Sequence, residues 1–137
     1  MMHLSMLLIA IAPQVATVLP PQQAIARVDA SRAKAVNGTF VMKVAVVVRT
    51  SDAFYLNSSM DIRSSGNLVF HLTPDAIRQL KEKLGPRADM ALVGRTVQVK
   101  GTLKRVPIVT TRKGDAASSD EVQYEVRVAS LSNLKVI

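Results

Sequence analysis

The fold is decided by ten residues, GRTVQVKGTL, at positions 94–103. Within them Val97, Val99 and Leu103 alternate with polar residues, which is the period of a half-buried β-strand. Gly101 stands where the next inward side chain would fall, and a glycine there is typical of a bulge or a sharp bend. The stretch therefore predicts a long strand that turns a corner of a sheet.

Four further strands and one helix are predicted around it. The strands alternate apolar and polar residues, and the full set lies at Thr39–Arg49, Ala53–Ser58, Asn67–Leu72, Thr96–Arg105 and Val122–Val128. The helix begins at Thr73-Pro74-Asp75, with Thr as N-cap and Pro in the first turn, and it ends before Gly85-Pro86. The order is three strands, one helix and two strands, in a chain of 137 residues that suits one domain.

This order, the long first strand and the glycine in the fourth strand resemble the OB-fold, a five-stranded Greek-key barrel with a helix at one end. Residues 94–103 are similar to the V-x-V-x-G-x-L/V pattern in the fourth strand of many OB-fold domains. The segment FYLNSSMDIR at 54–63, followed by NLVF at 67–70, resembles small exported bacterial proteins made of one such barrel. The resemblance implies an all-β fold with one helix over residues 39–137, and a binding or structural module more than an enzyme.

Residues 1–26 have the features of a secretory signal peptide. They carry no Lys, Arg, Asp or Glu, Leu4–Ala12 forms a short apolar core, and Ala24-Ile25-Ala26 supplies small residues for a signal peptidase. We therefore predict a signal peptide at 1–26, a polar leader at 27–38, and a periplasmic, envelope or secreted location. The alternatives are a disordered N-terminus or a short membrane anchor, because the apolar core is shorter than the roughly 20 residues of a spanning helix. No later segment qualifies as a span.

The chain is strongly basic, with 18 Lys+Arg against 10 Asp+Glu and a formal net charge of +8. A one-sided basic surface is typical of a polyanion binder. Alternation places five cations on outward faces of the predicted strands or at their ends, namely Lys43, Arg49, Lys100, Lys104 and Arg127. We predict that they bind a polyanion, either a single-stranded nucleic acid or an anionic glycan. The alternative is that they only keep a small domain soluble.

A second group of candidates lies on the second and third predicted strands and in their loop, and comprises Tyr55, Asn57, Asp61, Arg63, Asn67 and His71. The functional interpretation is a polar ligand site at this end of the sheet. The structural interpretation is a loop in which Asn and Asp close turns on backbone N–H groups and Arg63 pairs with Asp61. Tyr55 is the one predicted platform for a base, which argues against strong stacking of nucleobases.

The composition also excludes several kinds of chemistry. There is no Cys, which excludes disulfides, thiolate metal sites and a Cys nucleophile. His71 is the single His after residue 26, so we predict no zinc site, no Ser-His-Asp triad and no cofactor. The leading hypothesis is an exported, non-enzymatic polyanion-binding module. The alternatives are a protein-interaction module of the envelope that uses Val106-Pro107-Ile108-Val109, and a nucleic-acid hydrolase, which rests on fold analogy alone.

Overall fold

The structure is a computed structural model that describes residues 17–108 and 121–137. The strands are β1 (Val18–Leu19), β2 (Ala35–Lys43), β3 (Val46–Arg49), β4 (Phe54–Asn57), β5 (Leu68–Leu72), β6 (Thr96–Pro107), β7 (Val122–Val128) and β8 (Leu134–Val136). The helices are α1 (Pro21–Ala30), α2 (Pro74–Leu84) and α3 (Ala88–Leu92), with a 3-10 turn η1 at Leu131–Asn133.

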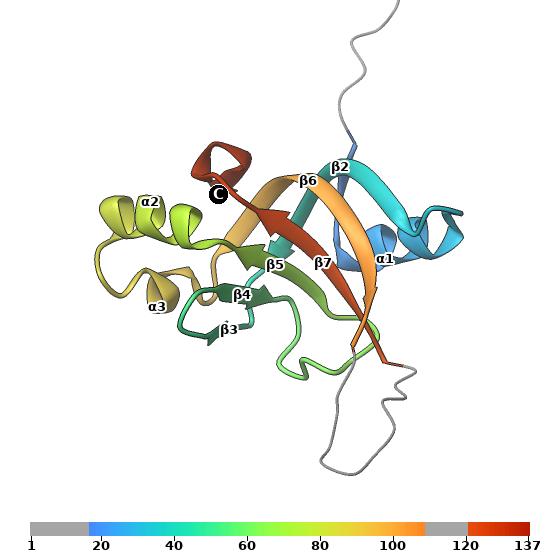
Figure 1. Ribbon diagram of the computed structural model, residues 1–137, viewed down its shortest axis with the longest axis horizontal. Helices are drawn as coiled ribbons and strands as arrows, with labels where there is room; N and C mark the ends of the chain where they lie inside the picture. Colours follow the sequence, from blue (N-terminus) through green and yellow to red (C-terminus); the bar gives the residue numbers. More distant parts are fainter. Residues whose placement is uncertain (1–16, 109–120) are drawn as a thin grey trace, which may run out of the picture.

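The strands form one mixed sheet. Seven of them are hydrogen-bonded in the order β1-β2-β6-β7-β5-β4-β3, and β8 pairs with β6 off this path. The pairs β1–β2 and β5–β7 are parallel and the others are antiparallel. Figure 1 shows α1 at one end of the sheet and both α2 and α3 at the other.

The prediction of a closed five-stranded barrel with one helix, and with it the resemblance to the OB-fold, is wrong. The sheet is open, with β1 and β3 at its two ends, and three helices accompany it in the part of the chain that is described. The physical reason is that alternation tells which side chains face the core but not which strands pair. The positions of the main strands and of α2 do agree with the sequence-based prediction.

The predicted strand Thr39–Arg49 is divided into β2 and β3, because its pairing partner changes within two residues. The Val44 N–H donates to Arg95 O at 2.9 Å, on the side of β6. The Ala45 N–H donates to Asn57 O at 2.8 Å, on the side of β4. The two halves of one extended segment therefore belong to distant positions in the strand order.

Gly101 lies in a regular ladder, and the predicted bulge is absent from the described pairing of β2 with β6. That pairing runs without an extra residue from Ala35 opposite Lys104 to Lys43 opposite Thr96. A Cβ atom at Gly101 would lie 3.0 Å from Cγ1 of Val126, which is tighter than ordinary packing. Close packing against Val126 of β7 therefore explains why a glycine stands at this position. Strand β6 itself curves strongly along its length (Figure 1).

The core is built by side chains of the strands and of all three helices. Its largest fully buried side chains include Phe40, Phe70, Leu56, Leu68, Leu72, Leu80, Leu92 and Leu103. The N-terminal segment also contributes, since Ala24 and Val28 of α1 are completely buried and Leu19 of β1 is 4% exposed. The predicted cleavage point after Ala26 therefore lies inside α1, although the signal peptide itself stays a prediction.

A polar contact fixes α1 to the sheet. The Tyr124 hydroxyl donates to the Asp29 carboxylate, 2.9 Å from Oδ1 and 3.0 Å from Oδ2, and Arg105 Nε lies 3.7 Å from Oδ1. Burial of the phenol raises the pKa of Tyr124 above its usual 10.0, and the hydrogen bond and negative charge of Asp29 raise it further, whereas Arg105 opposes this rise. The folded state therefore holds the phenolic proton more tightly than the unfolded chain does.

We expect this linkage to destabilise the fold at alkaline pH. Because the folded-state pKa of Tyr124 is raised, its contribution to stability is complete below about pH 10 and is lost as the pH rises through the folded-state value. Denaturant unfolding between pH 8 and pH 11.5 should show a steeper loss for the wild type than for Tyr124→Phe. Tyr55→Phe is the matched control and should retain the loss, because Tyr124 is still present. Equal slopes for the wild type and Tyr124→Phe would contradict the assignment.

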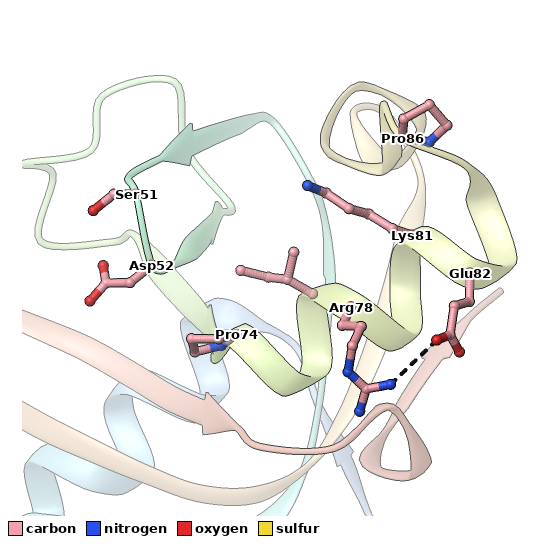
Figure 2. Close-up of a pocket in the computed structure, with 8 residues that line it drawn as sticks. Ser51, Asp52, Pro74, Arg78, Lys81, Glu82 and Pro86 are labelled. Carbon is pink, nitrogen blue, oxygen red and sulfur yellow. Dashed lines mark hydrogen bonds and ion pairs between the residues drawn. The ribbon is translucent and has the colours of Figure 1, made fainter.

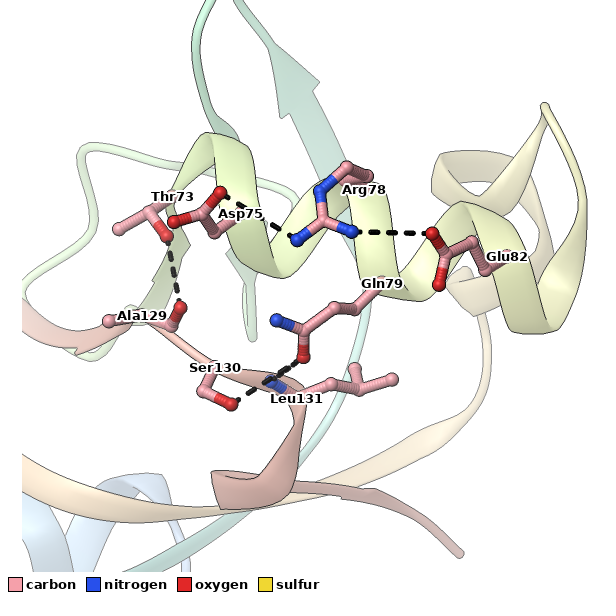
Figure 3. Close-up of polar contacts among 8 residues, drawn as sticks. All are labelled: Thr73, Asp75, Arg78, Gln79, Glu82, Ala129, Ser130 and Leu131. Carbon is pink, nitrogen blue, oxygen red and sulfur yellow. Dashed lines mark hydrogen bonds and ion pairs between the residues drawn. The ribbon is translucent and has the colours of Figure 1, made fainter.

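Helix α2 begins and ends where the sequence predicts, but Thr73 does not cap it with its side chain. The Thr73 hydroxyl is turned to Ala129 O at 3.5 Å, as Figure 3 shows. Gln79 on the same helix accepts the Leu131 N–H at 2.9 Å. These contacts attach α2 to the segment after β7. The helix ends at Gly85, which has a φ of 89°.

Candidate anion-binding surface

The outer face of the sheet carries two aligned rows of side chains. In one row Tyr55 of β4 lies opposite His71 of β5, and His71 lies opposite Arg127 of β7. In the next row, two residues along, Asn57, Val69, Glu125 and Lys104 are successive partners on β4, β5, β7 and β6. Residues from four strands are thereby collected on one surface.

His71 is held between two neighbours on this surface. Its ring stacks on that of Tyr55, with centroids 4.7 Å apart and an interplanar angle of 27°. Its Nδ1 atom lies 2.7 Å from Oε1 of Glu125. Both His71 and Glu125 keep partly exposed side chains, 24% and 21% respectively, so the pair can be reached by a ligand. The carboxylate fixes which ring nitrogen carries the proton and leaves the other edge of the imidazole free of this contact.

A cationic hollow of about 570 Å³ opens beside this pair. It is lined by His71, Lys100, Gly101, Thr102, Lys104, Glu125, Arg127, Ala129 and Asn133. Lys100, Lys104 and Arg127 are exposed, and none of them forms an ion pair within residues 17–108 and 121–137. Three cations thus face a hollow whose single carboxylate, on Glu125, already has His71 as a partner.

The two other predicted cations lie elsewhere. Lys43 is opposite Thr96, at the far end of the β2–β6 pair, and lines neither this hollow nor the one described next. Arg49 lies 3.5 Å from the Asp89 carboxylate of α3, which Arg87 also approaches at 3.6 Å. Asp89 is only 8% exposed, so Arg49 serves to neutralise a nearly buried charge. Of the five cations predicted to bind a polyanion, three therefore line one hollow and two lie elsewhere.

A second hollow of about 340 Å³ lies next to the first and shares Glu125 with it. It is lined by Val48, Tyr55, Asn57, Ile62, Arg63, Val69, Ile108, Glu121, Gln123 and Glu125. The stacked pair of Tyr55 and His71 stands between the two hollows, one ring in each. The second hollow thus mixes aliphatic side chains with amides, the Arg63 side chain and two carboxylates, and it lacks the excess of cations found in the first.

The loop candidates Asn57 and Asn67 are engaged with one another and with the backbone. Asn67 Nδ2 donates to Asn57 Oδ1 at 2.9 Å and to Ile62 O at 3.2 Å, while Asn67 Oδ1 accepts the Ser59 N–H at 3.0 Å. Asn57 Nδ2 donates to Tyr55 O at 3.0 Å. Both side chains are buried, at 3% exposure, so their polar groups hold the loop in shape and are not presented to solvent.

Asn67→Ala is expected to destabilise the domain by about 1–3 kcal/mol. The change leaves the side-chain carbonyl of Asn57 and the Ser59 N–H without a hydrogen-bond partner. A buried donor or acceptor that is left unsatisfied costs about 1–3 kcal/mol. Denaturant unfolding measures the effect. Asn133→Ala removes an exposed amide from the other end of the surface and should change the free energy of unfolding by less than about 0.5 kcal/mol. Equal stability of the two variants would contradict the structural role of Asn67.

Asp61 and Arg63 do not form the predicted side-chain pair among the contacts of the described residues. Asp61 Oδ1 accepts the backbone N–H of Arg63 at 3.2 Å, which closes a local turn. Arg63 instead lines the second hollow. Of the six loop and strand candidates, Asn57 and Asn67 are buried, whereas Tyr55, Asp61, Arg63 and His71 are at least partly exposed and can be reached by a ligand.

Glu125 is the main residue that sequence reasoning did not assign to the site. The signal was present, because Val122, Tyr124, Val126 and Val128 face inward by alternation and the residues between them must face out. What alternation could not supply is the parallel pairing of β5 with β7, which brings Glu125 to His71. Gln123, two residues earlier on β7, lines the second hollow together with Glu125.

A further hollow lies between α2 and the turn that precedes β4, and Figure 2 shows its side chains. Its charges are mixed. Arg78 pairs with Glu82 at 3.3 Å, and Lys81 stands 5.8 Å over the ring of Phe54. This hollow therefore offers no excess of free charge comparable to that at Lys100, Lys104 and Arg127.

Residues 17–108 and 121–137 contain no group of three or more His, Cys, Asp or Glu side chains that could hold a metal ion. None of the described helices combines the length and hydropathy that a membrane span requires.

Comparison with known proteins gives little further guidance. No family model matches the chain, and neither does any curated protein sequence. Among solved structures, one that is similar is the crystal structure of a protein described as an aspartyl-tRNA synthetase from Leishmania major Friedlin, with a TM-score of 0.48 and 8% identity. The match covers 93% of this chain and 22% of that one. A likeness of this degree carries no argument about function.

Proposed function

We propose that this protein is a non-enzymatic binding module for a polyanionic ligand, a nucleic acid or an anionic glycan. One observation carries the proposal: Lys100, Lys104 and Arg127 come from two strands to one hollow and have no ion-pair partners among the described residues. Cations that serve only solubility are usually scattered or paired, whereas an unneutralised cluster creates a positive field that attracts anions. His71 adds a hydrogen-bonding edge at the same hollow.

The number of cations sets the expected salt dependence. Each phosphate neutralised by a Lys or Arg releases condensed counterions, which lowers log K by about 0.7–0.9 per decade of salt. Three cations therefore predict a slope of about −2 to −3 in a plot of log K against log salt. A much steeper slope would require further cations beyond this hollow.

The direct test is a fluorescence-anisotropy titration of the full chain against labelled heparin and labelled single-stranded DNA, at several salt concentrations. We expect both to bind at low salt, with the slope given above. A strong preference for DNA that persists at high salt would mean that bases are read. If neither ligand binds at low salt, the polyanion proposal is rejected and the net charge serves solubility.

The proposed location is outside the cytoplasm, on the strength of the predicted signal peptide. Cell fractionation and mass determination of the mature N-terminus test this directly. Cleavage after Ala26 would leave a domain without β1 and without the first part of α1. An unprocessed chain in the cytoplasmic fraction would reject the proposed location without affecting the binding proposal.

Docking of a protein partner through Val106–Val109 is supported less well. Val106 and Pro107 are opposite Gln123 and Val122, so this stretch continues the β6–β7 pair. Val109 lies outside the described residues. Ile108 lines the hollow beside Tyr55 and Glu125.

A further inference from the structure

We infer that the ligand of the cationic hollow is an anionic glycan, a chain of sugars that carries sulfate or carboxylate groups, and that Glu125, Thr102 and Asn133 bind its uncharged hydroxyl groups. The inference rests on the proposed function, because it assigns the anionic groups to the same three cations. It goes further by choosing one of the two ligand classes and by naming the residues that would recognise it.

The hollow is formed where two pairing partners of β6 separate. The ladder of β6 with β7 ends at Leu103, and the ladder of β6 with β8 begins at Val99. Residues 100–102 lie between the two ladders, and all three line the hollow. Ala129 and Asn133, from the connection between β7 and β8, line it as well. Its position is therefore set by strand pairing, and neutral polar residues stand beside the cations.

The aromatic rings of the protein are poorly placed to stack a nucleobase in this hollow. Proteins that bind single-stranded nucleic acids usually stack successive bases on exposed aromatic side chains. Here the three Phe residues and Tyr124 are at most 4% exposed. Tyr55 lines the second hollow and not the cationic one, and its ring covers one face of His71 at a centroid distance of 4.7 Å. A nucleic acid would therefore be held by its phosphates alone.

The carboxylate of Glu125 distinguishes a glycan from a chain of phosphates. Its Oε1 atom lies 2.7 Å from Nδ1 of His71, and Oε2 has no hydrogen-bond partner among residues 17–108 and 121–137. A carboxylate accepts hydrogen bonds from hydroxyl groups but repels a phosphate. Sugars offer hydroxyl donors on most of their ring carbons, whereas RNA has one 2′-OH per nucleotide and DNA lacks it. The hollow therefore suits a ligand in which hydroxyl groups alternate with anionic groups.

Two uncharged side chains add to this recognition. Asn133 is exposed, and its amide forms no hydrogen bond within the part of the chain that the structure describes. The Thr102 hydroxyl donates to Asn37 Oδ1 at 2.6 Å, which leaves its oxygen lone pairs as acceptors. An amide and a hydroxyl at the edge of a cationic site add little affinity for phosphates, but they can exchange hydrogen bonds with sugar hydroxyls.

The test uses the full chain and four linear polyanions matched in their number of charges, namely a heparin oligosaccharide, single-stranded DNA, single-stranded RNA and inorganic polyphosphate. Each competes with a labelled heparin oligosaccharide in anisotropy titrations. Polyphosphate is the control for charge density, because it is a dense chain of anions without sugar hydroxyls or bases. We expect the oligosaccharide to bind about tenfold more tightly than each of the others. This preference should persist as salt is raised, because contacts between uncharged groups are not screened.

A matched pair of variants locates the hydroxyl contacts. Asn133→Ala should lower the affinity for the oligosaccharide about threefold to tenfold, and the affinity for polyphosphate by less than about twofold. Gln23→Ala is the control, because it removes another exposed amide, on α1, that does not line the hollow. Equal effects of the two substitutions on oligosaccharide binding would overturn the role of Asn133.

Glu125→Gln tests the carboxylate while it keeps the shape of the side chain and an oxygen that can accept from His71. Affinity for polyphosphate and for DNA should rise, because the repulsion is removed. Affinity for the oligosaccharide should change less, so the preference for the glycan should narrow. A preference that is the same in this variant as in the wild type would contradict the role of Glu125.

The outcomes separate the two proposals. If DNA or RNA binds at least as tightly as the oligosaccharide, or if polyphosphate equals it, the glycan inference is wrong and the polyanion proposal stands. If none of the four polyanions binds at low salt, both proposals fail together.

Discussion

A chain that begins at Arg27 is expected to be less stable than one that begins at Thr17 by at least about 4 kcal/mol. The shorter chain lacks Leu19 and Ala24, which are 4% and 0% exposed, and it lacks the pairing of β1 with β2. Loss of one buried leucine side chain alone costs about 2–5 kcal/mol. A small domain is stable by only about 5–15 kcal/mol, so this loss removes a large fraction of the stability of the domain.

Denaturant unfolding of the two chains measures this difference. The chain 17–137 is the appropriate reference, because it keeps every contact of the described N-terminal segment. A point variant provides an independent check, since Ala24→Asp places a charge at a completely buried position of α1 and should be similarly damaging. If residues 27–137 unfold at the same denaturant concentration as residues 17–137, the packing of β1 and α1 on the sheet does not matter for stability.

Reversal of two charges in the cationic hollow should weaken polyanion binding by about two orders of magnitude at low salt. Lys104→Glu and Arg127→Glu change exposed side chains on β6 and β7, so the fold should be retained. The salt dependence should also fall, by about one in slope for each cation removed. Anisotropy titrations with labelled heparin measure both effects.

The control for this variant changes the same net charge elsewhere. Arg32 and Lys83 are exposed, lie before β2 and on α2, and line neither hollow. Arg32→Glu with Lys83→Glu should lower affinity only through the smaller overall charge. If the two double variants bind equally weakly, net charge alone governs binding and the hollow is not a site.

The sequence predicts local structure better than it predicts pairing. Helix α2 follows from its proline start and glycine end, and β7 follows from four alternating apolar residues. In contrast, the first half of α1 also fits the pattern of a signal peptide. The sequence pattern therefore did not predict a helix packed on the sheet there. The parallel pairs β1–β2 and β5–β7 join segments far apart in the chain, and no local pattern specifies such partners.

The residues of the candidate site were likewise predicted only in part. Outward residues on regular strands, such as Lys104 and Arg127, are placed correctly by alternation, and the strand pairing then brings them together. Arg49 lies away from this hollow and next to Asp89, which belongs to a helix that the sequence did not predict. Asn57 is buried and accepts a hydrogen bond from the amide of Asn67, a tertiary contact that alternation could not predict.

The central claim is that the hollow beside His71 binds anions, and an amide chemical-shift titration of the isotope-labelled full chain with a short heparin oligosaccharide tests it most directly. We predict that the largest shifts occur at His71, at residues 100–104 and at residues 125–129, and that they disappear in the Lys104→Glu, Arg127→Glu variant. Shifts spread evenly over exposed Lys and Arg residues, or centred on α2, would contradict the account.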